Sequence, residues 1–225
     1  MLYHTFVVSD VRDNDRKPAS GYRLVDPRTT PFSTPQYRGN LPHLYKPGCT
    51  YFVTFCLQDA VPQKRLHRLE LQQHDDPIDL ARCNEPKEQI GKCILRRPRI
   101  GQLVEDSLLY FQNERYALFA WVVMPNHAHV VMAPFADYSL SMVLHSWKSY
   151  TASQIKKTLR CSGSVWQTES FDHLIRSEES FSRFVEYTEA NPVVAGLCLK
   201  ADDWPWSSAR YRAHFTDSGA ERYRY

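Results

Sequence analysis

One stretch restricts the fold of this chain more than any other: residues 121–134, which read WVVMPNHAHVVMAP. Valine and methionine run on both sides of Met124-Pro125-Asn126, a composition that favours two buried β-strands joined by a tight turn. Successive side chains of a strand point to opposite faces, so His127 and His129 are expected on one face. The sequence therefore predicts a hairpin that holds two imidazoles side by side on a rigid support.

Two imidazoles that share a strand face can give a metal ion two nitrogen ligands. The His-x-His spacing taken alone is equally compatible with a structural or surface role. A functional site would need further residues, from other segments of the chain, around His127 and His129.

The remaining segments alternate between strand and helix patterns. Strands are predicted at residues 50–57, 116–124 and 165–176, and helices at residues 99–116, 140–159 and 177–190, the last ended by Asn191-Pro192. With the histidine strand, the order is β-α-β-β-α-β followed by a C-terminal helix. This is the ferredoxin-like split βαβ arrangement of the α+β class. We expect an antiparallel sheet with helices on one face and the other face free for a ligand.

We expect a single domain at residues 41–210, because the chain has 225 residues and 43% of them are hydrophobic. Residues 1–40 are polar, basic and punctuated by proline, which predicts a mostly extended arm, either disordered or laid along a phosphate backbone. Residues 72–98 are a possible insertion or loop, and residues 211–225 a polar tail.

Composition excludes some classes of protein. The six cysteines form no CxxC pair and no zinc-finger spacing, which favours reduced thiols in a cytoplasmic protein. No signal-peptide pattern and no apolar stretch of membrane-spanning length is present, so we expect no membrane association. The net charge of +3 permits a nucleic-acid partner without arguing for one.

The predicted helix at residues 140–159 offers a tyrosine and an amide. Tyr150 and Gln154 stand four residues apart, at the border of the apolar stripe expected to face the sheet. A tyrosine hydroxyl beside a metal ion is a nucleophile next to an electrophile, which suits attack on a phosphodiester. Gln154 would add a neutral oxygen ligand, and such a mixed site suits Mg²⁺ or Mn²⁺ better than zinc. The residue pattern alone leaves ordinary packing open for both side chains.

The same helix is basic. Its cations could hold phosphate groups or could form a solvated helix face, and they are Lys148, Lys156, Lys157 and Arg160.

Short motifs in a fixed order carry a resemblance to a known family. They are RGNLPH at residues 38–43, TYFVTF at 50–55, MPNHAHVVM at 124–132, KSYTA at 148–152, VWQ at 165–167, FDHLIR at 171–176, NPVVAGL at 191–197 and WPWSSA at 204–209. MPNHAHVVM resembles the MPNH-x-H signature of the HUH single-tyrosine transposases, in which U is a hydrophobic residue. The ordered set, over about residues 38–210, resembles the REP-associated tyrosine transposases, which are bacterial, domesticated relatives of the smallest insertion-sequence transposases.

The resemblance implies a metal-dependent endonuclease and strand transferase. A tyrosine would cut single-stranded DNA at repetitive extragenic palindromes (REPs), which are imperfect hairpins, and leave a 5′-phosphotyrosine and a free 3′-OH. Position within the motifs assigns His127 and His129 as ligands of Mg²⁺ or Mn²⁺, Tyr150 as the nucleophile and Gln154 as the third ligand. The chain departs from the signature at Ala128, which is small where a bulkier residue is usual.

The resemblance also suggests partners. Arg38, His43 and Asn126 lie in the motifs and join the basic helix residues as candidate DNA contacts. A cytoplasmic protein, associated with the nucleoid when bound to DNA, is expected, and a monomer is favoured over a homodimer.

Two other enzyme classes use paired histidines but fit less well. Histidine-triad hydrolases need a third histidine where this chain has Val131, and two-histidine phosphoesterases need a second His-x-Thr or His-x-Ser copy. The remaining alternative is a transposase-derived protein that binds hairpin DNA without cutting it.

Overall fold

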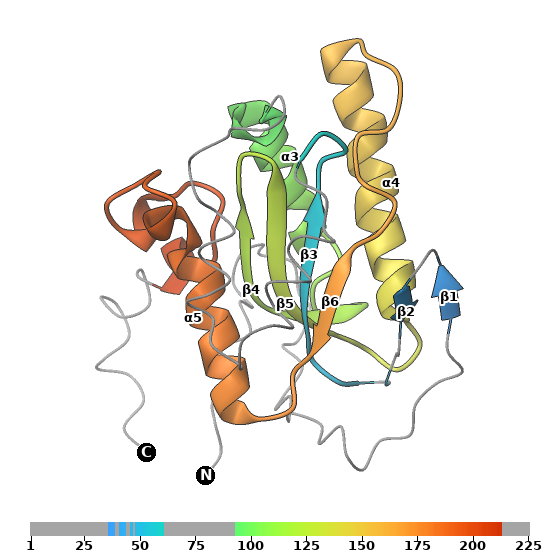
Figure 1. Cartoon of the computed structure of the whole chain (residues 1–225), viewed down its shortest axis with the longest axis vertical. Helices are drawn as coiled ribbons and strands as arrows, with labels where there is room; N and C mark the ends of the chain where they lie inside the picture. The colour runs from blue at the N-terminus through green and yellow to red at the C-terminus, as the bar shows by residue number, and fades with distance from the viewer. Residues whose placement is uncertain (1–35, 39–40, 44–45, 47, 61–92, 213–225) are drawn as a thin grey trace.

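A four-stranded antiparallel sheet in the order β4-β5-β3-β6 organises the molecule (Figure 1). The computed structural model describes residues 36–38, 41–43, 46, 48–60 and 93–212. The predictions for most of the basic arm, most of the 72–98 stretch and most of the polar tail lie outside the described residues.

The elements follow the predicted order. The sheet strands are β3 (Tyr51–Cys56), β4 (Tyr116–Val123), β5 (His127–Pro134) and β6 (Phe171–Leu174). The helices are α3 (Pro98–Leu109), α4 (Leu140–Leu159) and α5 (Glu178–Val194), with short 3-10 helices η2 (Ile94–Arg96) and η3 (Ala201–Asp203). A separate ribbon pairs β1 (Gln36–Arg38) with β2 (Leu41–His43). The α+β class and the ferredoxin-like element order are confirmed.

Helix ends follow local chemistry in most places. Ser139 accepts a hydrogen bond from the Met142 amide and begins α4 at the predicted residue, and Ser177 caps α5 in the same way. The prediction that Asn191-Pro192 ends α5 is wrong, because the helix continues to Val194. A proline so close to the helix end removes only one hydrogen bond.

The alternation of side chains along β5 divides the core into two layers. Ala128, Val130 and Met132 pack on the side of α3 and α4, whereas Val131 packs with Phe52 on the side of α5. The two crossover helices thus share one face, as predicted. No helix among the described residues is both long and apolar enough to cross a membrane.

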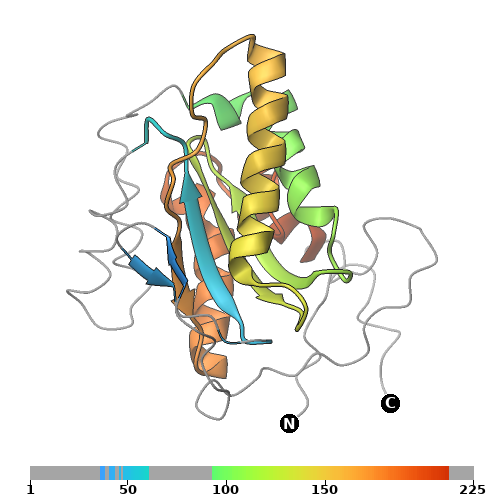
Figure 2. The same cartoon turned by 90° about the vertical axis from the view of Figure 1, so that its right-hand side faces the viewer.

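The expectation that the opposite face would be free is wrong. Helix α5 lies across it, on the other side of the sheet from α4 (Figures 1 and 2). Phe184 stacks on Phe52 with ring centroids 4.6 Å apart, and Phe181 meets Phe119 edge-on at 5.2 Å. This face carries large aromatic side chains, so burial by a helix removes apolar surface that would otherwise contact water.

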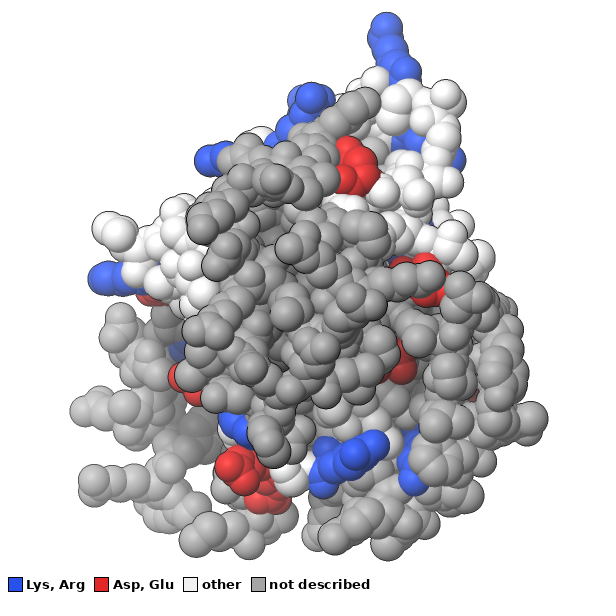
Figure 3. All heavy atoms as spheres, viewed as in Figure 1, with Lys and Arg blue, Asp and Glu red and all other residues white. Residues whose placement is uncertain are grey.

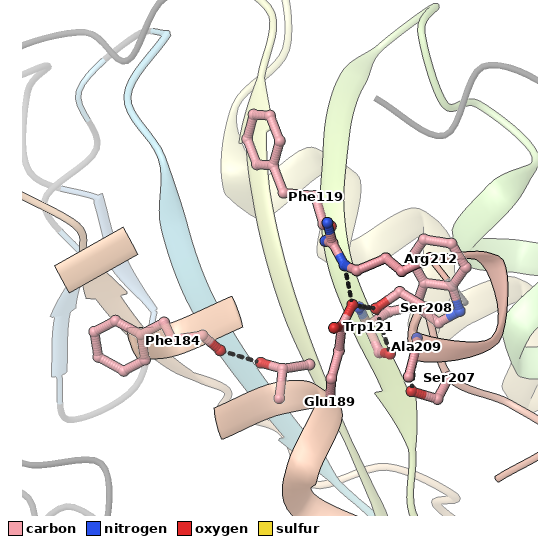
Figure 4. Close-up of polar contacts among 9 residues, drawn as sticks. Phe119, Trp121, Phe184, Glu189, Ser207, Ser208, Ala209 and Arg212 are labelled. Carbon is pink, nitrogen blue, oxygen red and sulfur yellow. Dashed lines mark hydrogen bonds and ion pairs between the residues drawn. The ribbon is translucent and has the colours of Figure 1, made fainter. Parts of the chain in front are cut away.

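A polar contact fastens α5 to the outer edge of β4 (Figure 4). Glu189 of α5 accepts hydrogen bonds from Ser208 Oγ at 2.6 Å and from Arg212 Nε at 2.5 Å. Ser208 also bonds the backbone of Trp121 in β4. Arg212 Nη2 donates to the carbonyl of Phe119, beside the β-bulge between Leu118 and Ala120. The segment after α5 therefore joins the helix to the edge strand.

We expect Glu189→Gln to lower the free energy of unfolding by about 1–3 kcal/mol. The substitution removes the charge that Arg212 balances, and only 14% of the Glu189 side chain is exposed. Urea unfolding followed by circular dichroism measures the effect. Glu186→Gln, on the exposed side of the same helix, is the matched control and should change stability by less than about 0.5 kcal/mol. Equal effects of the two substitutions would contradict a role for this contact.

Candidate active site

His127 and His129 lie side by side on β5, on the sheet face that α5 covers. The two Nε2 atoms are 3.0 Å apart. His127 Nδ1 lies 2.7 Å from Asn126 Oδ1, and His129 Nδ1 lies 2.8 Å from Thr54 Oγ1 of the neighbouring strand β3. Each ring is therefore oriented through Nδ1, and both Nε2 atoms converge on one point.

Burial keeps both rings neutral, and the hydrogen bond to Asn126 fixes the tautomer of His127. Asn126 Oδ1 can only accept a hydrogen bond, so His127 carries its proton on Nδ1 and presents a lone pair at Nε2. Burial lowers the pKa of His127 to about 4. Burial and the neighbouring His127 lower the pKa of His129 well below its usual value. Neutral imidazoles at neutral pH are metal ligands.

The spacing of the two nitrogens allows both to bind one ion. At 3.0 Å, the two Nε2 atoms are close enough to lie about 2.1 Å from a common ion. Within the described residues, no group of three His, Cys, Asp or Glu side chains could hold a metal ion.

A tyrosine from α5 contacts this pair. The ring centroid of Tyr187 lies 5.3 Å from that of His129, and Phe52 stacks on His129 at 5.3 Å. Tyr187 and Phe52 also meet edge-on at 5.8 Å, so the three rings form one cluster. Asn191 follows Tyr187 by one helical turn and is buried. The structure thus brings the ring of Tyr187 against His129 and places an amide one turn further along the same helix.

Tyr150 and Gln154 are not brought to the histidines. They lie on α4, which packs against Ala128 and Val130 on the opposite sheet face. The Tyr150 side chain is 52% exposed. In this structure neither residue lies over the histidine pair, so their assignment as nucleophile and third ligand stays a prediction. Strand alternation points Ala128 and Val130 away from the histidines, so a helix packed on them lies on the other side.

The cations predicted to bind DNA occupy different environments. Lys148 Nζ donates to the Thr168 carbonyl at 3.0 Å and to Ser170 Oγ at 3.3 Å. Burial lowers the pKa of Lys148 to about 8, which fits an internal tie between α4 and the segment before β6 better than a phosphate contact. Lys157 and Arg160 are exposed at the end of α4, where Lys156 is half-buried.

The three remaining candidate DNA contacts are Asn126, Arg38 and His43. Asn126 orients His127, as described above. Arg38 and His43 belong to β1 and β2, of which only the backbone is described.

Sequence reasoning passed over Tyr187 and Asn191, although a signal for them exists. They have the same i, i+4 spacing as Tyr150 and Gln154, and Asn191 opens the NPVVAGL motif. Two helices in the described part of the chain, α4 and α5, therefore carry a tyrosine followed by an amide after one turn. Only the packing of the helices on the sheet distinguishes the two pairs.

Comparison with known proteins finds relatives of one kind. No family model matches the chain. It is 30% identical over 112 residues to a REP-associated tyrosine transposase of Escherichia coli (strain K12), which is 48% of this chain and 63% of that protein. It is 27% identical over 96 residues to a provisionally named REP-associated tyrosine transposase of Haemophilus influenzae, which is 38% of this chain and 54% of that protein. The chain thus covers less than two thirds of each relative.

One solved structure is similar in fold. It is that of a REP-associated tyrosine transposase bound to a REP hairpin, with a TM-score of 0.52 and 21% sequence identity. The similarity covers 80% of this chain and 86% of that one. The resemblance predicted from the ordered motifs is confirmed: this chain is similar in sequence and in fold to REP-associated tyrosine transposases.

Proposed function

We propose that this protein cuts and rejoins single-stranded DNA at palindromic hairpins through a tyrosine–DNA intermediate. One observation carries the proposal: two neutral imidazoles present Nε2 to a common point, and the ring of Tyr187 lies against one of them. The similarity to REP-associated tyrosine transposases supports it, and one of those relatives was solved with a REP hairpin.

Tyr187, rather than Tyr150, is the nucleophile that the geometry favours. In the proposed step, Tyr187 Oη attacks the scissile phosphorus, a P–Oη bond forms and the bond from phosphorus to the 3′ oxygen breaks. The phenol proton is released to solvent, and the departing 3′ oxygen takes up a proton. The product is a 5′-phosphotyrosine and a free 3′-OH. Because one phosphoester replaces another, the reverse attack by a 3′-OH can rejoin strands without a nucleotide cofactor.

The donor set fits a divalent cation such as Mg²⁺ or Mn²⁺. His127 and His129 would hold it, and the amide of Asn191 is the protein oxygen that lies one turn beyond Tyr187. A bound ion would polarise a phosphoryl oxygen and stabilise the charge that develops there. Asn126 and Thr54 fix the rings and so align the two Nε2 atoms beforehand.

Two further points belong to the proposal. The working unit is a monomer in this proposal, because one chain can supply His127, His129 and Tyr187. The alternative is a protein that binds hairpin DNA and does not cut it, and covalent capture of DNA separates the two.

We expect Tyr187→Phe to abolish covalent attachment to DNA and Tyr150→Phe to retain it. The first substitution removes the attacking oxygen from the ring beside His129, whereas the second alters an exposed side chain on the opposite side of the sheet. A labelled oligonucleotide that contains a REP-type hairpin is incubated with Mg²⁺ or Mn²⁺, and the protein–DNA band is measured on a denaturing gel.

Each outcome assigns a role. A covalent band that disappears only in Tyr150→Phe would show that α4 carries the nucleophile. Tight binding of hairpins by the wild type, without any covalent band in either metal, would establish the binding protein instead.

We expect Asn126→Ala to weaken Mn²⁺ binding by about 10–100-fold, because His127 loses the acceptor that fixes its tautomer and orientation. Gln154→Ala, on the far side of the sheet, should leave Mn²⁺ affinity unchanged. Titration of Mn²⁺ followed by electron paramagnetic resonance measures free ion directly and does not depend on activity. If Gln154→Ala weakened Mn²⁺ binding and Asn126→Ala did not, Gln154 would be the ligand and the proposed site would be wrong.

A further inference from the structure

Three arginines form a charged surface that the proposed chemistry does not use. Arg96, Arg97 and Arg99 lie at the junction of η2 and α3, and all three are exposed. None of them forms an ion pair with a carboxylate in the described part of the chain. We call these three residues the arginine rim.

The arginine rim borders the histidine hairpin. The Leu95 amide donates to the Pro125 carbonyl at 3.1 Å, and Pro125 stands two residues before His127. The Leu57 amide holds the same turn by donating to the Asn126 carbonyl at 2.8 Å. Lys and Arg side chains project from the upper end of the molecule, over α3 and the end of α4 (Figure 3). That end also contains the turn between β4 and β5 (Figure 1).

The backbone beneath the rim is firmly anchored. Leu95 and Ile100, on either side of the arginines, are fully buried in the core. Pro98 occupies the first turn of α3, a position that suits its fixed backbone angle. The three side chains therefore extend from a fixed backbone, so binding a ligand would order only the side chains and not the chain beneath them.

The charge at this junction opposes helix stability. The N-terminus of a helix carries partial positive charge and favours acidic residues, yet the first turn of α3 contains none. Arg97 occupies the N-cap position, and its side chain makes no capping hydrogen bond. Cations concentrated where the helix dipole is already positive are unfavourable in the free protein and favourable when an anion is bound.

We propose that the arginine rim binds backbone phosphates of the single strand that leads into the site at Tyr187. Guanidinium groups bind phosphate through two parallel hydrogen bonds, and such contacts do not depend on base sequence. This inference rests on the proposed function, in which DNA is the ligand. It adds a path for the single strand: from the site at Tyr187, the strand would cross the turn between β4 and β5 and reach the arginine rim.

The test is the salt dependence of DNA binding by the full-length chain. A fluorescent oligonucleotide with a hairpin and a single-stranded flank is titrated without divalent metal, so that no cleavage occurs. We expect the triple variant R96Q/R97Q/R99Q to reduce the slope of log Kd against log salt concentration by about 2, or about 0.7 for each phosphate that an arginine no longer neutralises. The reduction should be the same for flanks of different sequence.

Arg176→Gln is the control, because it removes one exposed arginine far from the arginine rim. Arg176 is exposed and follows β6 at the opposite end of the sheet, where the Ile175 amide bonds the Thr50 carbonyl. Its substitution should leave the slope unchanged. Thermal melting checks the fold, and the triple variant should melt at the wild-type temperature or above, because cations leave a helix N-terminus.

A second arm uses DNA whose flanking phosphates are replaced by neutral methylphosphonates. The wild type should lose affinity for this strand, and the triple variant should bind it as it binds the natural strand. If the folded triple variant kept the wild-type slope of log Kd against log salt concentration, phosphate binding by the arginine rim would be disproved, and the proposed function would stand. Failure of the wild type to bind the oligonucleotide at all would overturn both the rim and the proposed function.

Discussion

The antiparallel pairing of β5 with β3 is the constraint on which the rest of the structure depends. It sets His129 opposite Thr54 and His127 opposite Cys56 in the middle of the sheet. Because side chains alternate, a register shift of one residue would turn both histidines to the face of α4. Hydrogen bonds on both edges of β5 exclude such a shift and hold the two Nε2 atoms at 3.0 Å.

The same pairing makes His129 a core residue and a candidate ligand at once. The residue is only 4% exposed, and its ring contacts those of Phe52 and Tyr187. Packing fixes the ring, and burial keeps it neutral. Burying a polar ring is unfavourable for stability, but it holds Nε2 of His129 in a fixed position beside Nε2 of His127. The Glu189–Arg212 contact belongs to this arrangement, because it holds α5, and with it Tyr187, across the face.

Much of the fold could be predicted from periodicity and turn chemistry. The limits of α4 agree to the residue because an apolar stripe and a serine cap mark them locally. The end of α5 was misjudged at Pro192, where the loss of one backbone hydrogen bond is small beside the packing of the helix on the sheet. The packing of α5 on the histidine face could not be predicted, because no local sequence pattern indicates on which face of a sheet a later helix packs.

The histidine pair, its common face and its resemblance to a transposase signature were determined by the sequence alone, since they depend on spacing within one strand. The preference for Tyr187–Asn191 over Tyr150–Gln154 as the proposed pair comes only from the tertiary structure. Both pairs have identical helical spacing, and the difference between them is the side of the sheet on which each helix packs. That side follows from long-range burial of Val130 under α4 and of Phe52 under α5, which no short segment encodes.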